Sequence, residues 1–225
     1  MTEPHVRRDL ELERIRLDEH SWVDIGRGWM AGAEELYDHL LHQVAWQPRR
    51  MYRYDHYVDE RRLGAGWGRD RGQPLPHPVL AEATRLLQGT YGVTFDGFVM
   101  IQYRDGDDGQ GFHRDTDMRW LDATLIAILS LGAQRPWLLR PRAGRSLEAP
   151  LKGATHDLAP ASGDLLVMGG RSQADWEHSV AYQPGRRIGP RLSIQWRHVR
   201  RTGRPYVGSS YNAPRHFGDQ PSRAR

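Results

Sequence analysis

Apolar residues recur at helical spacing in two segments of the N-terminal half. The segment AGAEELYDHLLHQV (31–44) repeats leucines three or four positions apart, which predicts an amphipathic helix. A second helix is expected over residues 77–91, because Pro78 stands in its first turn, where proline is favoured. The stretch between them, residues 46–68, is aromatic, basic and glycine-ended, and it predicts an irregular hairpin or lid.

From residue 94 onward the pattern becomes that of short strands, apolar or alternating, between Gly, Pro and Asp turns. Seven strands are predicted, over residues 97–104, 123–132, 136–142, 156–160, 163–170, 177–183 and 191–199. Short strands at regular spacing are typical of an antiparallel sandwich or barrel, and the two helices ahead of them can cover one face. The fold class expected from this order is mainly β with flanking helices (α+β).

A chain of 225 residues suffices for one domain with a substantial core. We expect a single domain over residues 21–201, preceded by a charged, partly ordered segment (1–20) and followed by a basic, flexible tail (202–225). The longest apolar run, residues 123–132, is too short to span a bilayer, and the start of the chain lacks the apolar core of a secretory signal. These features predict a cytoplasmic protein without membrane contact.

The composition limits the chemistry in two ways. Cysteine is missing, which excludes disulfides, thiolate metal ligands and a cysteine nucleophile, so any metal must be held by His, Asp or Glu. The formal net charge is +4, and Lys152 is the only lysine among 32 basic residues. An arginine-rich surface suits phosphate backbones. A coding bias that favours arginine explains the same composition, so charge alone does not establish nucleic-acid binding.

A metal-ligand spacing occurs in the run His113-Arg114-Asp115, with His178 far downstream. Two residues apart on a strand, His113 and Asp115 project to the same face and can grip one ion. Two histidines and one carboxylate on one face of the metal are typical of non-haem Fe(II) oxygenases, which leave the opposite positions open. Taken alone, His178 is better explained as a surface or hydrogen-bonded core residue; the order of the motifs along the chain favours the metal site.

The last predicted strand contains RLSIQWR (191–197), whose side chains alternate between two faces. Arg191, Ser193 and Arg197 share one face. The two arginines lie about 20 Å apart along a strand, and their long side chains can bracket a dicarboxylate through paired hydrogen bonds. Tyr103 can add a hydroxyl. The alternative is a solvated outer face of an edge strand, but with the metal motif present the arginines indicate an Fe(II)/2-oxoglutarate dioxygenase.

Five motifs follow one another along the chain: YRDG-x(5)-FHRDTD (103–117), SLGAQR (130–135), GDLLVMGG (163–170), WEHSV (176–180) and RLSIQWR (191–197). In this combination the chain resembles the AlkB family of Fe(II)/2-oxoglutarate-dependent nucleic-acid dealkylases, and RRMY (49–52) and GWG (66–68) look like that family's lid. The resemblance implies a double-stranded β-helix (jelly roll) over about 94–201. It also implies N-terminal helices and a nucleotide-recognition lid over about 46–76.

The resemblance also implies roles for individual residues. The iron ligands would be His113, Asp115 and His178, and the co-substrate 2-oxoglutarate would be held by Tyr103, Ser193, Arg191 and Arg197. Arg191 would take the distal carboxylate, and Arg197 would lie near Asp115 at the iron-chelating end. The best-studied bacterial pattern has Asn where this chain has Ile101 and Ser193, which removes or shortens a polar contact to the co-substrate.

The chemistry that the resemblance implies is oxidative demethylation, by O2 and 2-oxoglutarate, of 1-methyladenine and 3-methylcytosine in DNA or RNA. The enzyme would act as a monomer on a flipped or unpaired base, preferably in single-stranded nucleic acid. Met51, Tyr52 and Trp67 are candidates to stack on that base, and packing of the lid is the alternative role for them. Asp117 matches an acidic position near the base; capping of a turn is the alternative.

Two other functions fit the same residues. The first is the same chemistry on a modified tRNA, a protein side chain or a small molecule, because this scaffold hosts many substrates. The second is a non-catalytic jelly roll that binds nucleic acid through its basic lid. The intact set of metal ligands argues against the second.

Overall fold

The computed structural model describes residues 2–53, 56–68, 72–115, 123–142 and 154–199, which form two main antiparallel sheets and flanking helices. The large sheet contains, in spatial order, β2 (Glu13–Arg16), β3 (Ser21–Gly26), β12 (Leu165–Gly170), β9 (Thr124–Gly132), β14 (Arg191–Val199), β7 (Gly97–Tyr103), β6 (His56–Gly68) and β5 (Gln47–Arg53). The small sheet contains β11 (His156–Asp157), β10 (Trp137–Pro141), β13 (Trp176–Val180) and β8 (Gln110–His113). Two short strands, β1 (His5–Val6) and β4 (Met30–Ala31), pair separately.

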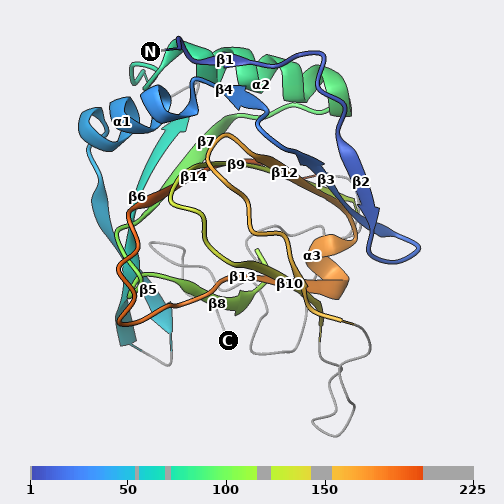
Figure 1. Cartoon of the computed structure of the whole chain (residues 1–225). Coiled ribbons are helices and arrows are strands. Elements are labelled where there is room, and N and C mark those ends of the chain that lie inside the picture. Colours follow the sequence, from blue (N-terminus) through green and yellow to red (C-terminus); the bar gives the residue numbers. More distant parts are fainter. Residues whose placement is uncertain (1, 54–55, 69–71, 116–122, 143–153, 200–225) are drawn as a thin grey trace, which may run out of the picture.

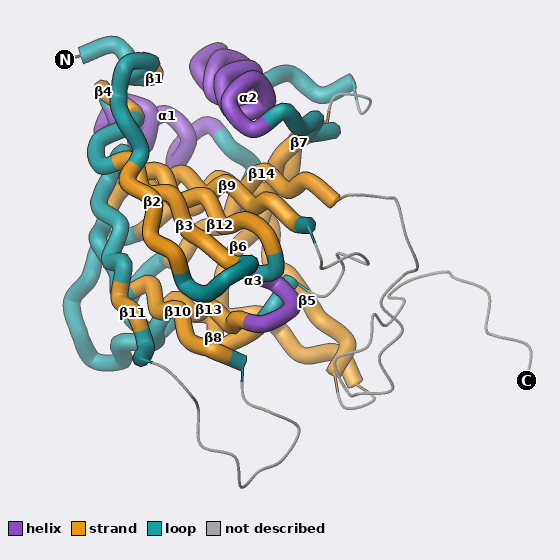
Figure 2. Tube along the Cα trace, turned by 90° about the vertical axis from the view of Figure 1, so that its right-hand side faces the viewer, coloured by secondary structure: helices purple, strands orange, loops and turns teal. Residues whose placement is uncertain are grey.

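The elements stack in layers. Figure 1 shows the small sheet facing one side of the large sheet, with helices α1 (Ala33–Gln43) and α2 (Pro78–Tyr91) on the other side. The turned view in Figure 2 shows the same order, with the short helix α3 (Ser172–Asp175) beside the small sheet. The mainly β fold class and its two covering helices are therefore confirmed. Within the described residues, no helix has the length and hydropathy needed to cross a membrane.

Two separate apolar cores follow from these layers. The helix-side core lies between the helices and the large sheet and includes Leu36, Leu40, Leu80, Leu129, Ile194 and Trp196. The inter-sheet core lies between the two sheets and includes Val23, Ile101, Ile128, Leu139 and Leu166. Since side chains alternate along a strand, β7, β9 and β12 each contribute to both cores, whereas Leu192, Ile194 and Trp196 of β14 lie in the helix-side core.

Helix α2 begins and ends at residues suited to those positions. The ring nitrogen Nδ1 of His77 accepts a hydrogen bond from the backbone N–H of Val79 at 3.2 Å, and Pro78 occupies the first helical position. Gly92 closes the helix with φ 62°, a left-handed conformation that glycine adopts without strain. The two predicted helices are found within two residues of their expected ends.

The seven predicted strands are all present, but the N-terminal strands were not predicted. Residues 1–20 contain β1 and β2, and β3 pairs with β12 inside the large sheet. The sequence of β3, SWVDIG, includes the buried charge of Asp24, which obscures the apolar pattern of a strand. Asp24 is accommodated by two hydrogen bonds from Arg14, at 2.6 and 2.8 Å, and one from the hydroxyl of Tyr91 at 2.9 Å.

Strands β5 and β6 pair antiparallel as the two arms of the expected hairpin, with a register shift between Pro48 and Arg50, and the long second strand also pairs with β7. The hairpin therefore continues the large sheet, and Figure 1 shows it bending down to the level of the small sheet. The register pairs Leu63 with Gln102 and Gly64 with Ile101, so each residue of β6 has a defined face. This defined alternation decides which hairpin residues face the interior between the sheets.

Candidate metal centre

The two candidate histidine ligands come from neighbouring strands of the small sheet. In the register of β13 and β8, His178 lies opposite His113, and their ring centroids are 4.3 Å apart. The His178 ring also stacks on Trp137 at 5.4 Å with an interplanar angle of 16°. The His178 ring is therefore packed between Trp137 and His113.

Asp115 reaches the site from a loop and not from a strand. Strand β8 ends at His113, so the expectation that both ligands project from one strand is wrong for Asp115. The side-chain oxygen of the buried Gln173, on α3, accepts a hydrogen bond from the Asp115 backbone N–H at 2.9 Å. Arg114 in turn donates to the backbone oxygens of Gln173 and Ala174. Helix α3 therefore positions the loop that carries Asp115.

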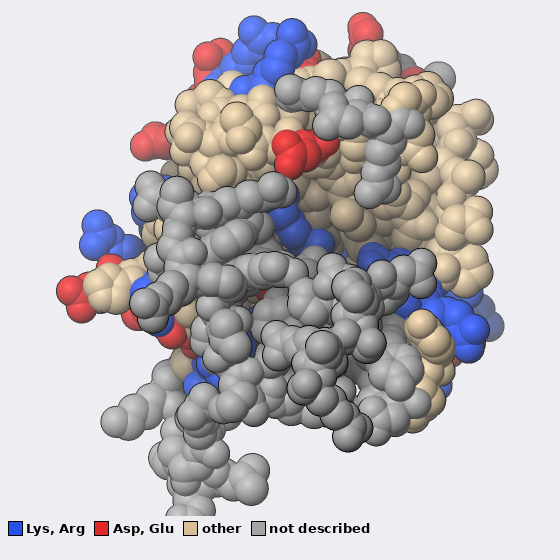
Figure 3. Space-filling view, turned by 180° about the vertical axis from the view of Figure 1, so that it is seen from behind, with Lys and Arg blue, Asp and Glu red and all other residues tan. Residues whose placement is uncertain are grey.

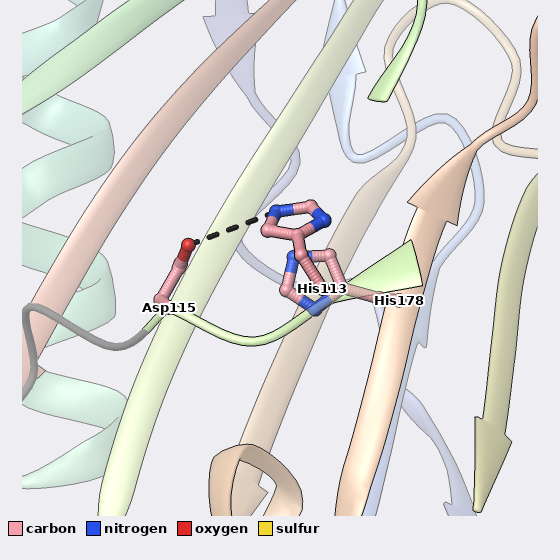
Figure 4. A group of neighbouring side chains, drawn as sticks. All are labelled: His113, Asp115 and His178. Atoms are coloured by element: carbon pink, nitrogen blue, oxygen red, sulfur yellow. Dashed lines mark ion pairs between the residues drawn. The ribbon is translucent and has the colours of Figure 1, made fainter. Parts of the chain in front are cut away.

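The three side chains converge as a metal site requires. One candidate ligand atom each from His113, Asp115 and His178 lies within 4.8 Å of the others. Figure 4 shows the three side chains together, with His113 Nε2 at 3.8 Å from Asp115 Oδ1. The other nitrogen of His113, Nδ1, lies 2.9 Å from the Gly111 carbonyl oxygen and must donate to it, which leaves Nε2 unprotonated.

Burial and charge set the protonation states of the three groups. Burial, followed by the charge of His113, lowers the pKa of His178 to about 3, and burial lowers the pKa of His113 as well. Burial by itself would raise the pKa of Asp115, but the charges of Arg197, His178 and His113 outweigh it and lower this pKa to about 2. At neutral pH the site holds two neutral imidazoles and one carboxylate, the states that bind a divalent cation.

Strand β14 separates polar from apolar residues as its sequence predicted. Leu192, Ile194 and Trp196 lie in the helix-side core. Arg191, Ser193 and Arg197 alternate with them on the opposite face, where Ser193 is buried and its hydroxyl accepts a hydrogen bond from Gln195 at 3.1 Å. Ile101 lies opposite Ser193 in the register and belongs to the inter-sheet core.

Arg191 is a buried cation with unused hydrogen-bond donors. Its Nη2 donates to Ser130 at 2.7 Å, while Nε and Nη1 have no hydrogen-bond partner within the described part of the chain. Tyr103, also buried, lies opposite it in the register, and its ring centroid is 5.6 Å from the guanidinium carbon. Burial lowers the pKa of Arg191 to about 10. Burial of a guanidinium that has no carboxylate partner is unfavourable in free energy, so this position is suited to bind an anion.

Arg197 lies at the metal ligands and contacts Asp115. Its Nε is 3.0 Å from Asp115 Oδ2, and its Nη2 donates to Gln195 at 2.8 Å. Arg191 and Arg197 therefore mark opposite ends of one polar row along β14. The row is bounded at one end by the metal ligands and at the other by Tyr103.

Comparisons with known proteins identify this constellation. A model of the 2OG-Fe(II) oxygenase superfamily matches residues 31–197. The chain belongs to this superfamily. Human alkB homolog 3, an alpha-ketoglutarate-dependent dioxygenase, is 29% identical over 177 residues, which cover 74% of this chain and 62% of the relative. The human DNA oxidative demethylase ALKBH2 is 30% identical over 122 residues, 54% of this chain and 46% of the relative.

Solved structures agree with this membership at the level of the fold. The structure of OsALKBH1 superposes with a TM-score of 0.54 at 14% identity, covering 83% of this chain and all of that one. A prolyl hydroxylase from Trichoplax adhaerens gives a TM-score of 0.54 at 11% identity, with 77% and 82% of the two chains covered. The resemblance to the AlkB family is confirmed, and so is the jelly-roll fold. The chain spans less than two thirds of the length of human alkB homolog 3 and of human ALKBH2.

The superfamily implies Fe(II) and 2-oxoglutarate, and the residues present fit both. Two neutral histidines and a carboxylate are the ligand set of non-haem Fe(II). Arg191 offers two buried N–H groups without partners, which suit one carboxylate of a dicarboxylate. The metal would be held by His113, Asp115 and His178, and the co-substrate by the row that begins at Arg191.

The residues predicted to contact a base are not found beside the metal ligands in the described part of the chain. Trp67 stacks on Phe98 at 5.4 Å, and its Nε1 donates to the Gln73 carbonyl at 3.1 Å. It packs against the helix-side core, on the face of the large sheet opposite to the metal ligands, which favours the alternative role of packing over stacking on a base. The side chains of Met51 and Tyr52, in β5, and all of Asp117 lie outside the described residues.

Two buried residues near the site were not predicted. Gln173 lies in RSQAD, which has no metal-ligand pattern and whose helix is only four residues long. Arg135 donates to the backbone oxygens of Asp105, Asp108 and Ala181 at 2.8 to 2.9 Å and to the side chain of Gln183 at 3.1 Å. It thereby ties the loop before β8 to the segment after β13.

Proposed function

We propose that this protein is an Fe(II)- and 2-oxoglutarate-dependent dioxygenase that oxidatively demethylates N-alkylated bases in nucleic acid. The proposed first substrates are 1-methyladenine and 3-methylcytosine in DNA or RNA. The observation that carries the proposal is the group His113, Asp115 and His178, which lies on the same side of the large sheet as the buried Arg191, whose Nε and Nη1 have no hydrogen-bond partner within the described residues. The printed names of the relatives, a dioxygenase and a DNA oxidative demethylase, support the substrate class.

The residues of the chain have separate tasks in this reaction. When bound, iron and 2-oxoglutarate supply the oxidation of an N-methyl carbon, which leaves as formaldehyde. His113, Asp115 and His178 would hold the metal and leave room at it for the co-substrates. Arg191 neutralises one carboxylate and Arg197 holds Asp115 in its ionised state. The stacked rings of His178 and Trp137 keep that side of the site apolar and dry.

The β5–β6 hairpin supports a nucleic-acid substrate. Tyr57 is 58% exposed, and the guanidinium of Arg50 lies 5.5 Å from its ring centroid. An exposed aromatic ring next to an arginine suits stacking on unpaired bases along a phosphate backbone. The face shown in Figure 3 carries several separate groups of basic side chains with acidic ones among them. The hairpin is therefore a better guide to the binding surface than the overall charge.

The test is turnover of 2-oxoglutarate across a panel of methylated and unmethylated single-stranded oligonucleotides, with succinate and formaldehyde both measured. Equal amounts of succinate and formaldehyde are expected from oligonucleotides that carry 1-methyladenine or 3-methylcytosine. The Asp115→Asn variant serves as the control without a functional metal site. Succinate without formaldehyde on every oligonucleotide would contradict the demethylation and favour a protein or small-molecule substrate. Salt-independent binding of the oligonucleotides would contradict a phosphate-binding hairpin.

A further inference from the structure

The hairpin contributes one buried cation, Arg62, that has no role in the chemistry described so far. Arg62 is 9% exposed, whereas its neighbour Arg61 on the same strand is exposed. Its Nε and Nη2 donate to the two carboxylate oxygens of Glu60 at 3.0 and 3.2 Å. Glu60 also lies 3.5 Å from the Nε of Arg49. A buried arginine held in a fork by a carboxylate is fixed in orientation as well as in charge.

The sheet register brings Arg62 to the co-substrate pocket. Because Leu63 pairs with Gln102, the preceding residue Arg62 lies beside Tyr103 on the next strand. Tyr103 in turn pairs with Arg191. The three side chains thus form one row across β6, β7 and β14, on the face opposite the helix-side core. This pairing brings the Arg62 guanidinium, which can only donate, within reach of the Tyr103 hydroxyl oxygen, which can accept a hydrogen bond from it.

This hydrogen bond determines what the Tyr103 hydroxyl can offer. A phenol oxygen accepts hydrogen bonds and carries a single hydrogen to donate. With Arg62 donating to that oxygen, the hydroxyl hydrogen must point elsewhere. The neighbouring group is Arg191, whose own donors repel a hydrogen and attract a carboxylate. The hydroxyl is therefore oriented to donate to an anion that Arg191 binds.

We propose that Arg62 is a positioning residue for the binding of 2-oxoglutarate. Arg62 orients the Tyr103 hydroxyl so that it donates to the carboxylate held by Arg191. The inference rests on the use of 2-oxoglutarate proposed above and is independent of the alkylated substrate. It gives the hairpin a second task besides contact with nucleic acid. Substitutions at Arg62 are expected to change the affinity for the co-substrate even when no nucleic acid is present.

The test is a double-mutant cycle on equilibrium binding of 2-oxoglutarate. Binding is measured by calorimetry on the Fe(II)-loaded protein without oxygen, for wild type, Arg62→Met, Tyr103→Phe and the double variant. Each single substitution is expected to weaken binding about tenfold, the effect of one hydrogen bond to a charged group. Because Arg62 acts through the hydroxyl, Arg62→Met should cause little further loss in the Tyr103→Phe background.

Controls separate positioning from a general structural effect. Arg61→Met makes the same change one residue away on the exposed face and should leave the dissociation constant unchanged. Arg62→Lys keeps the charge beside Glu60 without the fork, is expected to restore binding only in part, and replaces Arg62→Met if that variant does not fold. In turnover, Arg62→Met should raise KM for 2-oxoglutarate far more than it lowers kcat.

Two results would overturn the proposal, and they differ. If wild type binds 2-oxoglutarate and Arg62→Met weakens binding equally in both backgrounds, Arg62 does not act through Tyr103. If wild type itself fails to bind 2-oxoglutarate, the co-substrate assignment is wrong and the role of Arg62 falls with it.

Discussion

The two faces of strand β14 use neighbouring residues for opposite purposes. On one face, Ile194 and Trp196 are fully buried in the helix-side core, and Trp196 Nε1 donates to the hydroxyl of Thr84 at 2.8 Å. On the other face, Arg191 is equally buried but leaves two donors unused. On the first face the apolar side chains are packed and the indole N–H has its partner. On the second face the burial of an arginine with unused donors is unfavourable, and a bound anion would remove that free-energy penalty. Stability and function should therefore respond separately to substitutions on this strand.

Asp115 contacts the polar face of β14 through Arg197, and Asp115→Ala is expected to have the largest effect on metal binding and turnover. Removal of the carboxylate takes away the only charged ligand, so metal affinity should fall by more than the roughly 10- to 100-fold typical of losing an outer-shell partner. Turnover of 2-oxoglutarate should become undetectable. Iron stoichiometry measured after gel filtration checks the metal, and unchanged stoichiometry in both His113→Ala and His178→Ala would refute the site.

The largest effect on the apolar face is expected for Trp196→Ala. The substitution leaves a large cavity and removes the partner of Thr84, so the free energy of unfolding should fall by about 3–5 kcal/mol. Urea denaturation of the metal-free protein measures this change. The fraction that remains folded should bind 2-oxoglutarate with the affinity of wild type. A large loss of affinity there would mean that the two faces of β14 are coupled.

Arg191→Met is expected to have the opposite pattern to Trp196→Ala: it should weaken the binding of 2-oxoglutarate without lowering the stability of the protein. Loss of hydrogen bonds from a charged group should weaken 2-oxoglutarate binding by about 10- to 100-fold, corresponding to about 1.5–3 kcal/mol. The metal-free protein should unfold at the same or a higher denaturant concentration, because a buried cation without an anion has been replaced by an apolar side chain. Calorimetry and urea denaturation give the two numbers. A variant less stable than wild type would show that Arg191 already has adequate partners.

The smallest effect concerns the helix side and pH. His77 accepts from Val79 through Nδ1 and must be neutral to do so, and its ring meets that of His39 edge-on at 5.0 Å. Burial and the charge of His39 lower the pKa of His77, so the unfolded chain takes up a proton first as the pH falls. Stability is therefore complete at neutral pH and decreases as the pH drops through the range of an ordinary histidine. The partly exposed cap limits the change to less than about 1 kcal/mol.

His77→Asn tests this cap with a matched residue. Asparagine caps a helix as well as histidine does and does not titrate. Stability at pH 7 should be close to that of wild type, and the decrease between about pH 7 and pH 5 should become shallower. An unchanged slope would assign the pH dependence to other histidines.

Local patterns were sufficient for the helices, the central strands and the metal ligands. Leu36 and Leu40 repeat at helical spacing, and the alternation in RLSIQWR assigned both faces of β14 correctly. Strand β3 could not be found in this way, because its buried Asp24 is explained only by Arg14 and Tyr91, which are distant in sequence. A polar residue inside a strand becomes recognisable only when its partners are known.

The missed site residues have the same physical origin. Gln173 accepts a hydrogen bond from the Asp115 backbone, and Arg62 lies beside Tyr103, only because the fold brings these distant segments together. The two roles considered for Trp67 could not be separated, because an irregular hairpin or lid over residues 46–68 has no predicted register. Once they are recognised as a strand paired with β7, strict alternation places Trp67 beside Phe98 and Arg62 beside Tyr103. The sequence names the reactive groups, and the register decides which way they face.

Arg135 bears on the rate at which iron can bind to the site. Its four hydrogen bonds join the loop before His113 to the segment after His178, so the two histidines are held together without metal. Iron then enters a site whose conformational entropy was already lost during folding. We therefore expect metal uptake to be a single bimolecular step, without a slow phase for the ordering of β8 and β13.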